Sequence, residues 1–195
     1  MLSDQDIKAA LAGGQIVISP EPADRSIQPA SIDLHLGPTF ARWAVKGATL
    51  RLADGTAPEL MELVQGPTFA LAPGEHALAA TLERVKLGAG YAARVEGRST
   101  FGRLGLAIHV TAGFVDPGWP GWLFFPMADE GQITLEFVNF SPNTLVLDVG
   151  MPICQLAIER LSSPAERPYG SAGIGSKYAG RAGVQRPRLE GIVPR

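Results

Sequence analysis

The chain has 195 residues, a size typical of one domain, and it contains 23 glycines and 16 prolines. Because both residues destabilise helix interiors, this composition argues against an all-helical bundle, and 46% hydrophobic residues exclude a disordered chain. Seventeen basic and 19 acidic residues give a net charge of -2, so nucleic-acid binding over the whole surface is not expected. The single cysteine excludes a disulfide framework and a zinc site with several thiolates.

The N-terminal residues predict a short helix. Ser3 and Asp6 resemble a capping box, Ile7 and Leu11 lie four residues apart, and a Gly-Gly pair at 13–14 ends the pattern. The N-terminus shows no signal-peptide pattern, and no apolar run is long enough to span a membrane. We therefore expect a cytoplasmic protein without a membrane partner.

The rest of the chain consists of short strand-like runs separated by glycine and proline. The expected strands are 15–18, 31–36, 68–71, 84–87, 104–110, 133–140, 144–149 and 153–158. Residues 94–103, with three arginines, are expected to form a turn. Many short strands at this spacing predict an all-β fold with a short N-terminal helix, a barrel or jelly roll, in one domain over residues 1–195.

The last thirty residues differ in composition from the rest. Residues 166–195 contain six basic residues, two acidic residues and six glycines. Composition by itself is typical of a solvated, frayed tail. The functional alternative is a flexible basic arm that closes over a polyanion, with glycine amides and basic side chains on phosphates.

Glu136 is a carboxylate in an otherwise apolar strand. Strand alternation puts it on the face opposite to Leu135 and Phe137. It is either an exposed residue on a solvated face or a buried general base whose charge arginines balance. Val138 and Phe140 share its face, which favours the second interpretation.

Other polar and aromatic residues have simpler explanations. Asp116 lies in a Pro-Gly turn, where aspartate is common. His35, His76 and His109 lack metal-ligand spacing and are interpreted as structural. The aromatic cluster at 119–125 indicates core or a subunit interface.

Six motifs occur in order along the chain. They cover residues 27–37, 97–106, 109–119, 133–137, 150–156, and 168–171 with 176–178. With these motifs the sequence resembles the dCTP deaminases, members of the trimeric dUTPase-like superfamily. The resemblance implies a distorted β-barrel or jelly roll, a homotrimer with active sites between subunits, and a tail at 166–195 that closes over the active site.

The implied reaction is hydrolysis of dCTP to dUTP and ammonia, which supplies dUTP or dUMP for thymidylate synthesis. The family uses no catalytic metal; Mg²⁺ is expected only with the triphosphate, and the H-x-E and P-C-x-x-C signature of zinc deaminases is absent from the sequence. dTTP is expected as a feedback inhibitor.

The resemblance implies roles for individual residues. Glu136 would take the proton of the attacking water and pass it to N3 and the departing ammonia, and Ser99 and Arg103 would orient the water and the glutamate. The implied substrate-binding residues are Arg98, Thr100, Phe101, Gly102, Thr111, Ala112, Asp116, Thr134, Leu135, Gln155, Tyr169, Lys177 and Arg181. Among these, the backbone at 111–112 would read the pyrimidine, and Asp116 would lie near the sugar 3′-hydroxyl.

Three departures from the family pattern leave alternatives open. Residues 122–132 form an insertion, Arg181 replaces a glutamine, and Gly113-Phe114 stands where many monofunctional deaminases have His-Arg. A small Gly113 leaves room for a second water near Asp116 that could attack the α-phosphorus. The chain could therefore be bifunctional, forming dUMP and diphosphate; a plain dUTPase and a non-catalytic nucleotide-binding regulator are further alternatives.

Overall fold

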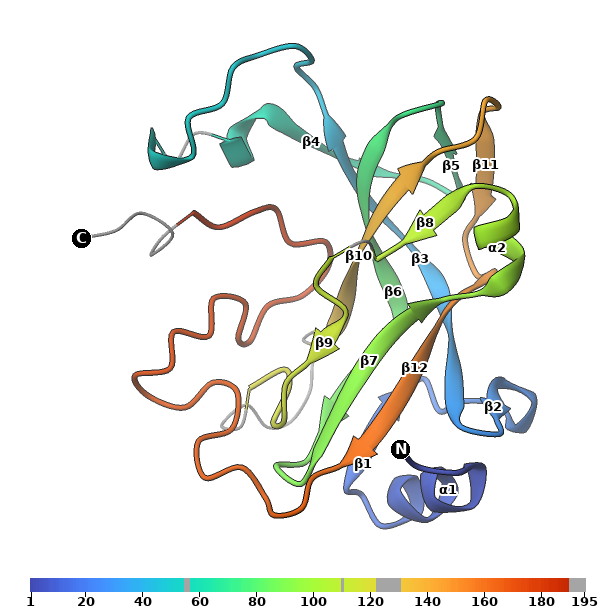
Figure 1. Ribbon diagram of the computed structural model, residues 1–195, viewed down its shortest axis with the longest axis vertical. Coiled ribbons are helices and arrows are strands. Elements are labelled where there is room, and N and C mark those ends of the chain that lie inside the picture. The colour runs from blue at the N-terminus through green and yellow to red at the C-terminus, as the bar shows by residue number, and fades with distance from the viewer. Residues whose placement is uncertain (55–56, 110, 122–130, 190–195) are drawn as a thin grey trace.

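Strands dominate the computed structural model, which describes residues 1–54, 57–109, 111–121 and 131–189 (Figure 1). The helices are α1 (Asp4–Ala12) and α2 (Ser99–Arg103), and three 3-10 turns span Asp24–Ser26, Leu52–Asp54 and Ala57–Leu60. The strands are β1 (Ile16–Ser19), β2 (Ile27–Gln28), β3 (Ser31–Trp43), β4 (Met61–Gln65), β5 (Thr68–Leu71), β6 (His76–Leu87), β7 (Tyr91–Gly97), β8 (Leu106–Ile108), β9 (Phe114–Val115), β10 (Gln132–Asn139), β11 (Leu145–Asp148) and β12 (Pro152–Arg160).

Helix α1 has the predicted ends. The Asp6 N–H donates to the Ser3 side-chain oxygen at 3.3 Å, and the Gly13 N–H donates to the Ala9 carbonyl at 2.9 Å. Ile7 is fully buried, so the apolar side of the helix packs onto the sheet core. The predicted N-terminal helix is confirmed.

The main sheet is antiparallel and curls on itself. Its strand order is β8-β10-β6-β3-β12-β7-β9, with β1 beside β6, β2 and β4 beside β3, and a separate β5–β11 pair. Strands β8 and β9 follow each other in the chain but lie at opposite ends of this order. Residues 109 and 111–113, which we call the bridging segment, contact both ends: the His109 N–H donates to the Glu136 carbonyl at 3.0 Å, and the Val95 N–H donates to the Gly113 carbonyl at 2.8 Å. This curled, mainly β architecture confirms the predicted fold class.

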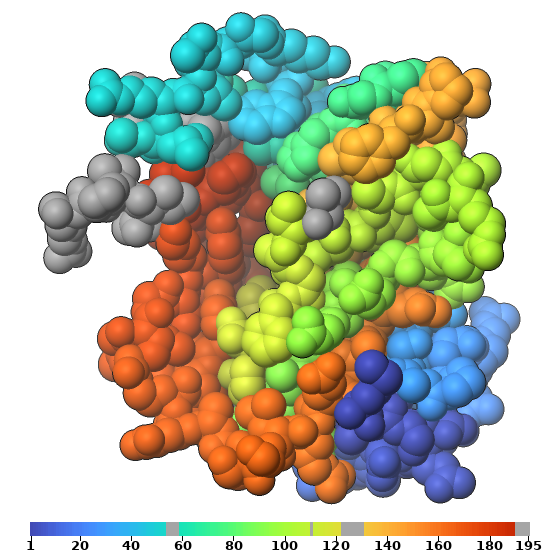
Figure 2. Space-filling model, viewed as in Figure 1, coloured from blue at the N-terminus to red at the C-terminus, as the bar shows by residue number. Residues whose placement is uncertain are grey.

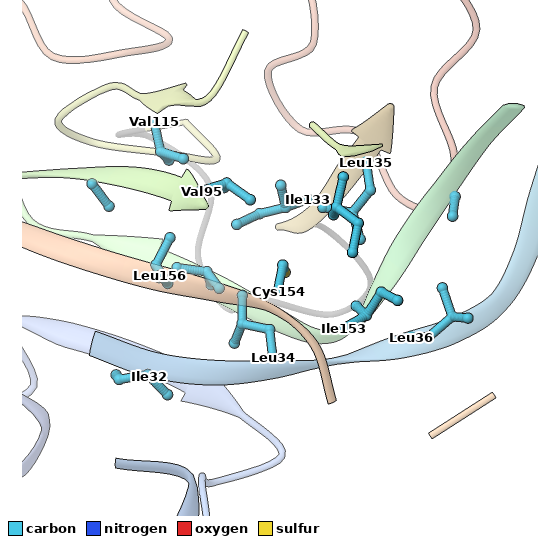
Figure 3. Packing of buried hydrophobic residues seen from close by; sticks show 14 of the residues in the cluster. Ile32, Leu34, Leu36, Val95, Val115, Ile133, Leu135, Ile153, Cys154 and Leu156 are labelled. Carbon is cyan, nitrogen blue, oxygen red and sulfur yellow. The ribbon is translucent and has the colours of Figure 1, made fainter. Parts of the chain in front are cut away.

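The core fills the space inside the curl. Side chains from β3, β7, β10 and β12 converge there, among them Leu34, Val95, Leu135 and Leu156 (Figure 3). Leu34, Leu135 and Leu156 have no exposed surface. Strand alternation therefore leaves the opposite faces of these strands free to carry polar groups.

Two strands extend beyond the predicted boundaries. Strand β3 continues past Gly37 and Pro38 to Trp43. At Gly37 it runs so close to β6 that a side chain would lie 2.9 Å from the Ala80 carbonyl oxygen. The glycine thus permits close strand approach at a register shift and does not end the strand. Strand β6 starts at His76 rather than near residue 84.

The expected turn at 94–103 is wrong. Residues 94–97 are the end of β7, where exposed Arg94 and Glu96 alternate with buried Val95, and residues 99–103 form α2. Strand β7 is held between β12 and β9, so cross-strand pairing overrides the polar composition.

The C-terminal segment (residues 166–189) lies against one side of the molecule. In Figures 1 and 2 its orange-to-red chain is beside the yellow-green segment that contains β9. Its Tyr169 N–H donates to the Pro117 carbonyl at 2.7 Å, and its Gly180 N–H donates to the Pro120 carbonyl at 3.0 Å. In the described part of the chain, none of the helices is long and apolar enough to cross a membrane.

Candidate active site

Glu136 lies at the centre of β10 on the face away from the core. Buried and half-buried residues alternate along β10, and Glu136 is half-buried while Leu135 and Phe137 are buried. The residue paired with it on β6 is Leu78, which is 6% exposed. The carboxylate therefore sits on a largely apolar surface and not on a freely solvated one.

A pocket of about 350 Å³ opens beside this carboxylate, between β10 and β9. Five predicted site residues line it: Glu136, Thr134, Ala112, Asp116 and Tyr169. We call this group, together with Thr111, the glutamate pocket. The fold thus brings together residues that are up to 58 positions apart in the chain.

Thr111 and His109 hold Glu136 from the bridging segment. The Thr111 hydroxyl donates to Glu136 Oε2 at 2.9 Å, and the His109 N–H donates to the Glu136 backbone carbonyl at 3.0 Å. His109 has a φ of 65°, a left-handed conformation that is uncommon outside glycine. The hydroxyl contact of Thr111 adds to the backbone role that the resemblance implies for this residue.

Asp116 borders two pockets. It lines the glutamate pocket and a second space of about 470 Å³, which is also lined by Lys177, Arg167 and Tyr169. The protein around Asp116 removes enough water from the carboxyl group to raise its pKa, although part of the residue is exposed. A carboxyl group with a raised pKa, in a space that Lys177 and Arg167 also line, is suited to proton transfer near a phosphate.

Tyr169 lines both pockets. Its ring lies 5.2 Å from the Trp119 ring, and its hydroxyl accepts the Tyr178 N–H at 3.1 Å. Burial raises the pKa of the Tyr169 hydroxyl, so the group is neutral and able to donate a hydrogen bond. It is therefore held in place by the C-terminal segment to which it belongs.

The C-terminal segment also contacts β10. The Gln185 N–H donates to the Thr134 hydroxyl at 3.2 Å, and the Gly183 N–H donates to the Gln132 side-chain oxygen at 3.0 Å. Between them, Val184 is 8% exposed and packs with Leu78 on the outer face of the sheet. That this segment closes over a bound nucleotide stays a prediction.

Four predicted residues, Arg98, Ser99, Arg103 and Gln155, lie outside the glutamate pocket; together with Asp33, which is not among the predicted residues, we call them the arginine cluster. Arg98 forms an ion pair with Asp33, which is 7% exposed and also accepts a hydrogen bond from Gln28 at 3.3 Å. Gln155 of β12 pairs with Asp33 of β3. Three more predicted residues, Thr100, Phe101 and Gly102, lie on α2.

Within one chain, the arginine cluster does not line the pocket beside Glu136. The chain just after α2 contacts the chain just after the C-terminal end of β10, where the Phe140 N–H donates to the Gly105 carbonyl at 2.8 Å. Figure 1 shows α2 and the C-terminal segment at opposite edges of the molecule. Ser99 and Arg103 are exposed and do not line the glutamate pocket.

Two predicted residues have different surroundings from those expected. The side chain of Leu135 is fully buried in the core, so contact with a ligand in the pocket would come from its backbone. Arg181 is exposed and is not among the residues that line either pocket. Residues 122–130 of the insertion lie outside the described residues.

Gly113 has a steric role at strand β7. A side chain at this position would lie 2.9 Å from the Val95 carbonyl oxygen, and the Gly113 carbonyl accepts the Val95 N–H at 2.8 Å. A glycine is thus needed for the bridging segment to pair with β7. The suggested space for a second water near Asp116 stays a prediction.

Sequence reasoning missed two histidines near Glu136. His109 lines the glutamate pocket, and neither of its buried ring nitrogens has a hydrogen-bond partner among the described residues. His76 lies next to Glu136 on the sheet. The signal for His109 was its place at the start of the motif 109–119, whereas His76 belongs to none of the motifs.

Within the described ranges, no three His, Cys, Asp or Glu side chains are grouped so that they could hold a metal ion. The carboxylates of the glutamate pocket and the arginine cluster therefore do not form a cation site among themselves. The absence of a catalytic metal stays a prediction, as does Mg²⁺ bound with the nucleotide.

Comparison with known proteins identifies the family. The dCTP deaminase-like family model matches residues 1–161, most of the chain. The chain belongs to this family. This result confirms the recognition from the six motifs and the expectation of an enzyme of the dCTP deaminase class.

Several relatives match over nearly their whole length. A "dCTP deaminase, dUMP-forming" of Dictyoglomus thermophilum is 44% identical, covering 97% of this chain and 94% of the relative. Proteins with the same description from Methanosphaera stadtmanae and Mycolicibacterium vanbaalenii are 40% and 43% identical, covering 97% and 94% of this chain and 94% and 92% of the relatives.

A solved structure shares the fold. The 2′-deoxycytidine 5′-triphosphate deaminase from Agrobacterium tumefaciens has a TM-score of 0.58 and 23% identity, covering 82% of this chain. The present chain spans about half of that longer protein, 47% of its length. At this identity the likeness concerns the fold alone.

Proposed function

We propose that this protein is a bifunctional dCTP deaminase that converts dCTP to dUMP, ammonia and diphosphate. The observation that carries the proposal is a half-buried carboxylate, Glu136, held by a hydroxyl donor in a pocket that also contains Asp116, in a chain of the dCTP deaminase-like family. The relatives at 40–44% identity described as dUMP-forming favour this alternative over release of dUTP as the final product.

The first step is deamination at C4 of cytosine. Glu136 takes a proton from the attacking water as the C4–O bond forms, and then delivers it toward N3 and the departing ammonia. The Thr111 hydroxyl donates a hydrogen bond to Oε2 of Glu136 at 2.9 Å, so Oε1 is the oxygen that faces the water. The products of this step are dUTP and ammonia.

The second step is hydrolysis of the triphosphate. A second water attacks the α-phosphorus, the bond to the β-phosphate oxygen breaks, and diphosphate leaves with dUMP as the other product. Asp116 accepts the proton of this water, a role supported by its raised pKa and by its place between the two pockets. Lys177 and Tyr169 bind phosphate oxygens, and Mg²⁺ arrives with the nucleotide to balance its charge.

We infer that the functional unit is a homotrimer in which the arginine cluster of one subunit completes the glutamate pocket of the next. Ser99 and Arg103 do not line the pocket beside Glu136 in one chain, which supports this inference, because a single subunit would lack the groups that orient the water. Arg98 would then bind the triphosphate across the interface. Inhibition by dTTP is a further prediction for the same site.

Product analysis tests the proposal directly. Purified protein is incubated with dCTP and Mg²⁺, and the nucleotides, ammonia and diphosphate are measured over time. Equal amounts of dUMP, ammonia and diphosphate, without build-up of dUTP, are expected. Accumulation of dUTP contradicts the second step, hydrolysis of dUTP but not dCTP indicates a plain dUTPase, and binding without turnover indicates a regulator.

A further inference from the structure

His76 shares a sheet face with Glu136. In the antiparallel pairing of β6 with β10, His76 is opposite Val138 and Leu78 is opposite Glu136. Residues that pair, and residues two positions apart on one strand, have side chains on the same face. His76 is therefore the diagonal neighbour of Glu136, at a separation of roughly 7 Å between backbone positions.

The His76 ring is partly withdrawn from solvent and incompletely paired. Its Nδ1 is buried and has no hydrogen-bond partner among the described residues. Burial lowers the pKa of His76, and the negative charge of Glu136 opposes this effect by raising it. A buried ring nitrogen without a partner is unfavourable in a purely structural histidine.

Among the described groups around His76, Glu136 is the carboxylate whose charge affects its pKa. Strand β3 presents Trp43, whereas Arg42 lies on the opposite face and pairs with Glu75. Arg186 of the C-terminal segment donates to the Met61 carbonyl of β4 at 3.2 Å. The bridging segment contributes His109, whose backbone N–H binds Glu136.

We propose that His76 is a positioning residue for Glu136, a second titratable group whose protonation keeps the neighbouring carboxylate ionised at acid pH. The proposal rests on the proposed function, because it assumes that Glu136 is the catalytic base. The coupling must be reciprocal: the carboxylate stabilises the imidazolium by the same free energy with which the imidazolium stabilises the carboxylate. Burial lowers the pKa of His76 from the ordinary imidazole value toward the range in which carboxyl groups titrate, so the coupling is expected to act on the acid side of the pH range.

An NMR titration of the histidine rings tests the coupling without requiring activity. The full chain and its Glu136→Gln variant are compared, and the signals of the three histidines are assigned with single His→Asn variants. We expect the midpoint of His76 to fall by roughly 0.5–1 pH unit in Glu136→Gln, because an anion has been removed. His35, which lies 2.5 Å from Glu83, is the internal control and keeps its midpoint.

An unchanged His76 midpoint overturns the proposal, even where Glu136→Gln abolishes deamination. A shifted midpoint in a protein that does not deaminate dCTP instead overturns the proposed function and leaves the coupling intact. The two failures are therefore distinguishable.

The pH profile of ammonia release gives the kinetic counterpart. In His76→Asn the acid-side midpoint of kcat/KM should move to higher pH by about the shift measured by NMR, because Glu136 has lost the cation that kept it ionised. Asp116 and the substrate phosphates titrate equally in both proteins, so they do not contribute to the difference. An unmoved acid limb overturns the proposal; His76→Gln serves as the second variant where His76→Asn does not fold.

Discussion

The glutamate pocket and the arginine cluster differ in where the fold puts them. Glu136 is half-buried on an apolar sheet face. The bridging segment hydrogen-bonds to it, and residues of the C-terminal segment line the same pocket. Ser99 and Arg103 lie on a short, exposed helix at the edge of the molecule opposite to the C-terminal segment, and Arg98 beside them forms an ion pair with a buried aspartate. One chain thus carries the two groups of residues expected to form the site, and different strands position each group.

This contrast suggests a division of tasks. The glutamate pocket has the groups suited to proton transfer, a carboxylate on an apolar face and a second carboxyl group with a raised pKa. The arginine cluster has permanent cations suited to phosphate and water orientation. Four measurements test whether the two groups differ in this way.

The largest effect is expected from disabling either half. Glu136→Gln and Arg103→Ala should each lower kcat for deamination roughly 10³-fold, since each removes a group needed in the transition state. When the two inactive variants are co-expressed, random trimers with sites between subunits should recover about a quarter of the wild-type sites.

Ammonia release by the purified mixture measures this recovery, and each variant expressed alone is the control. Failure of the mixture to regain activity would show that the two halves do not complement each other across an interface.

Asp116 should separate the two hydrolytic steps. Asp116→Asn should lower diphosphate release roughly 10²-fold or more while deamination continues, so dUTP accumulates. In the wild type the pKa of Asp116 is raised by burial, so the carboxyl holds its proton to higher pH than usual. The ratio of dUMP to dUTP should therefore fall as the pH is lowered toward the acid range, which quantitative chromatography of the products can follow.

Arg98 should affect binding more than chemistry. Arg98→Ala removes a charge-assisted contact with the triphosphate, and KM for dCTP should rise roughly 10- to 100-fold with a smaller change in kcat. Arg160→Ala, at the far end of β12, is the matched control and should leave KM unchanged. Equal effects of the two substitutions would contradict a specific role for Arg98.

Gly113 should give the smallest effect, on stability. In Gly113→Ala the new methyl group meets the Val95 carbonyl oxygen at 2.9 Å, which should cost about 1–3 kcal/mol of unfolding free energy. Gly90→Ala is the control, because a side chain there meets nothing within 4 Å. Thermal unfolding should show a lower Tm for Gly113→Ala, and equal Tm values would refute the steric explanation.

Local features of the sequence were enough to predict several elements. The capping residues at 3–6 and the glycine pair at 13–14 define α1, and period-two alternation correctly placed Leu135 and Glu136 on opposite faces of β10. The ordered motifs identified the family, because together they specify many residues in a fixed order along the chain. Such signals depend on neighbours in the chain and need no knowledge of the fold.

Long-range contacts decided the rest. Gly37 looks like a strand end in sequence, but in the structure it allows β3 to approach β6; the arginines at 94–98 suggest a turn, but pairing with β12 and β9 makes the segment a strand. The absence of α2 residues from the pocket at Glu136, and the position of His76 diagonally across from that carboxylate, depend on how the sheet curls. Which chemical groups the protein carries follows from its sequence, but which of them come into contact follows from the fold, because cross-strand pairing joins residues whose separation in the chain leaves no local pattern.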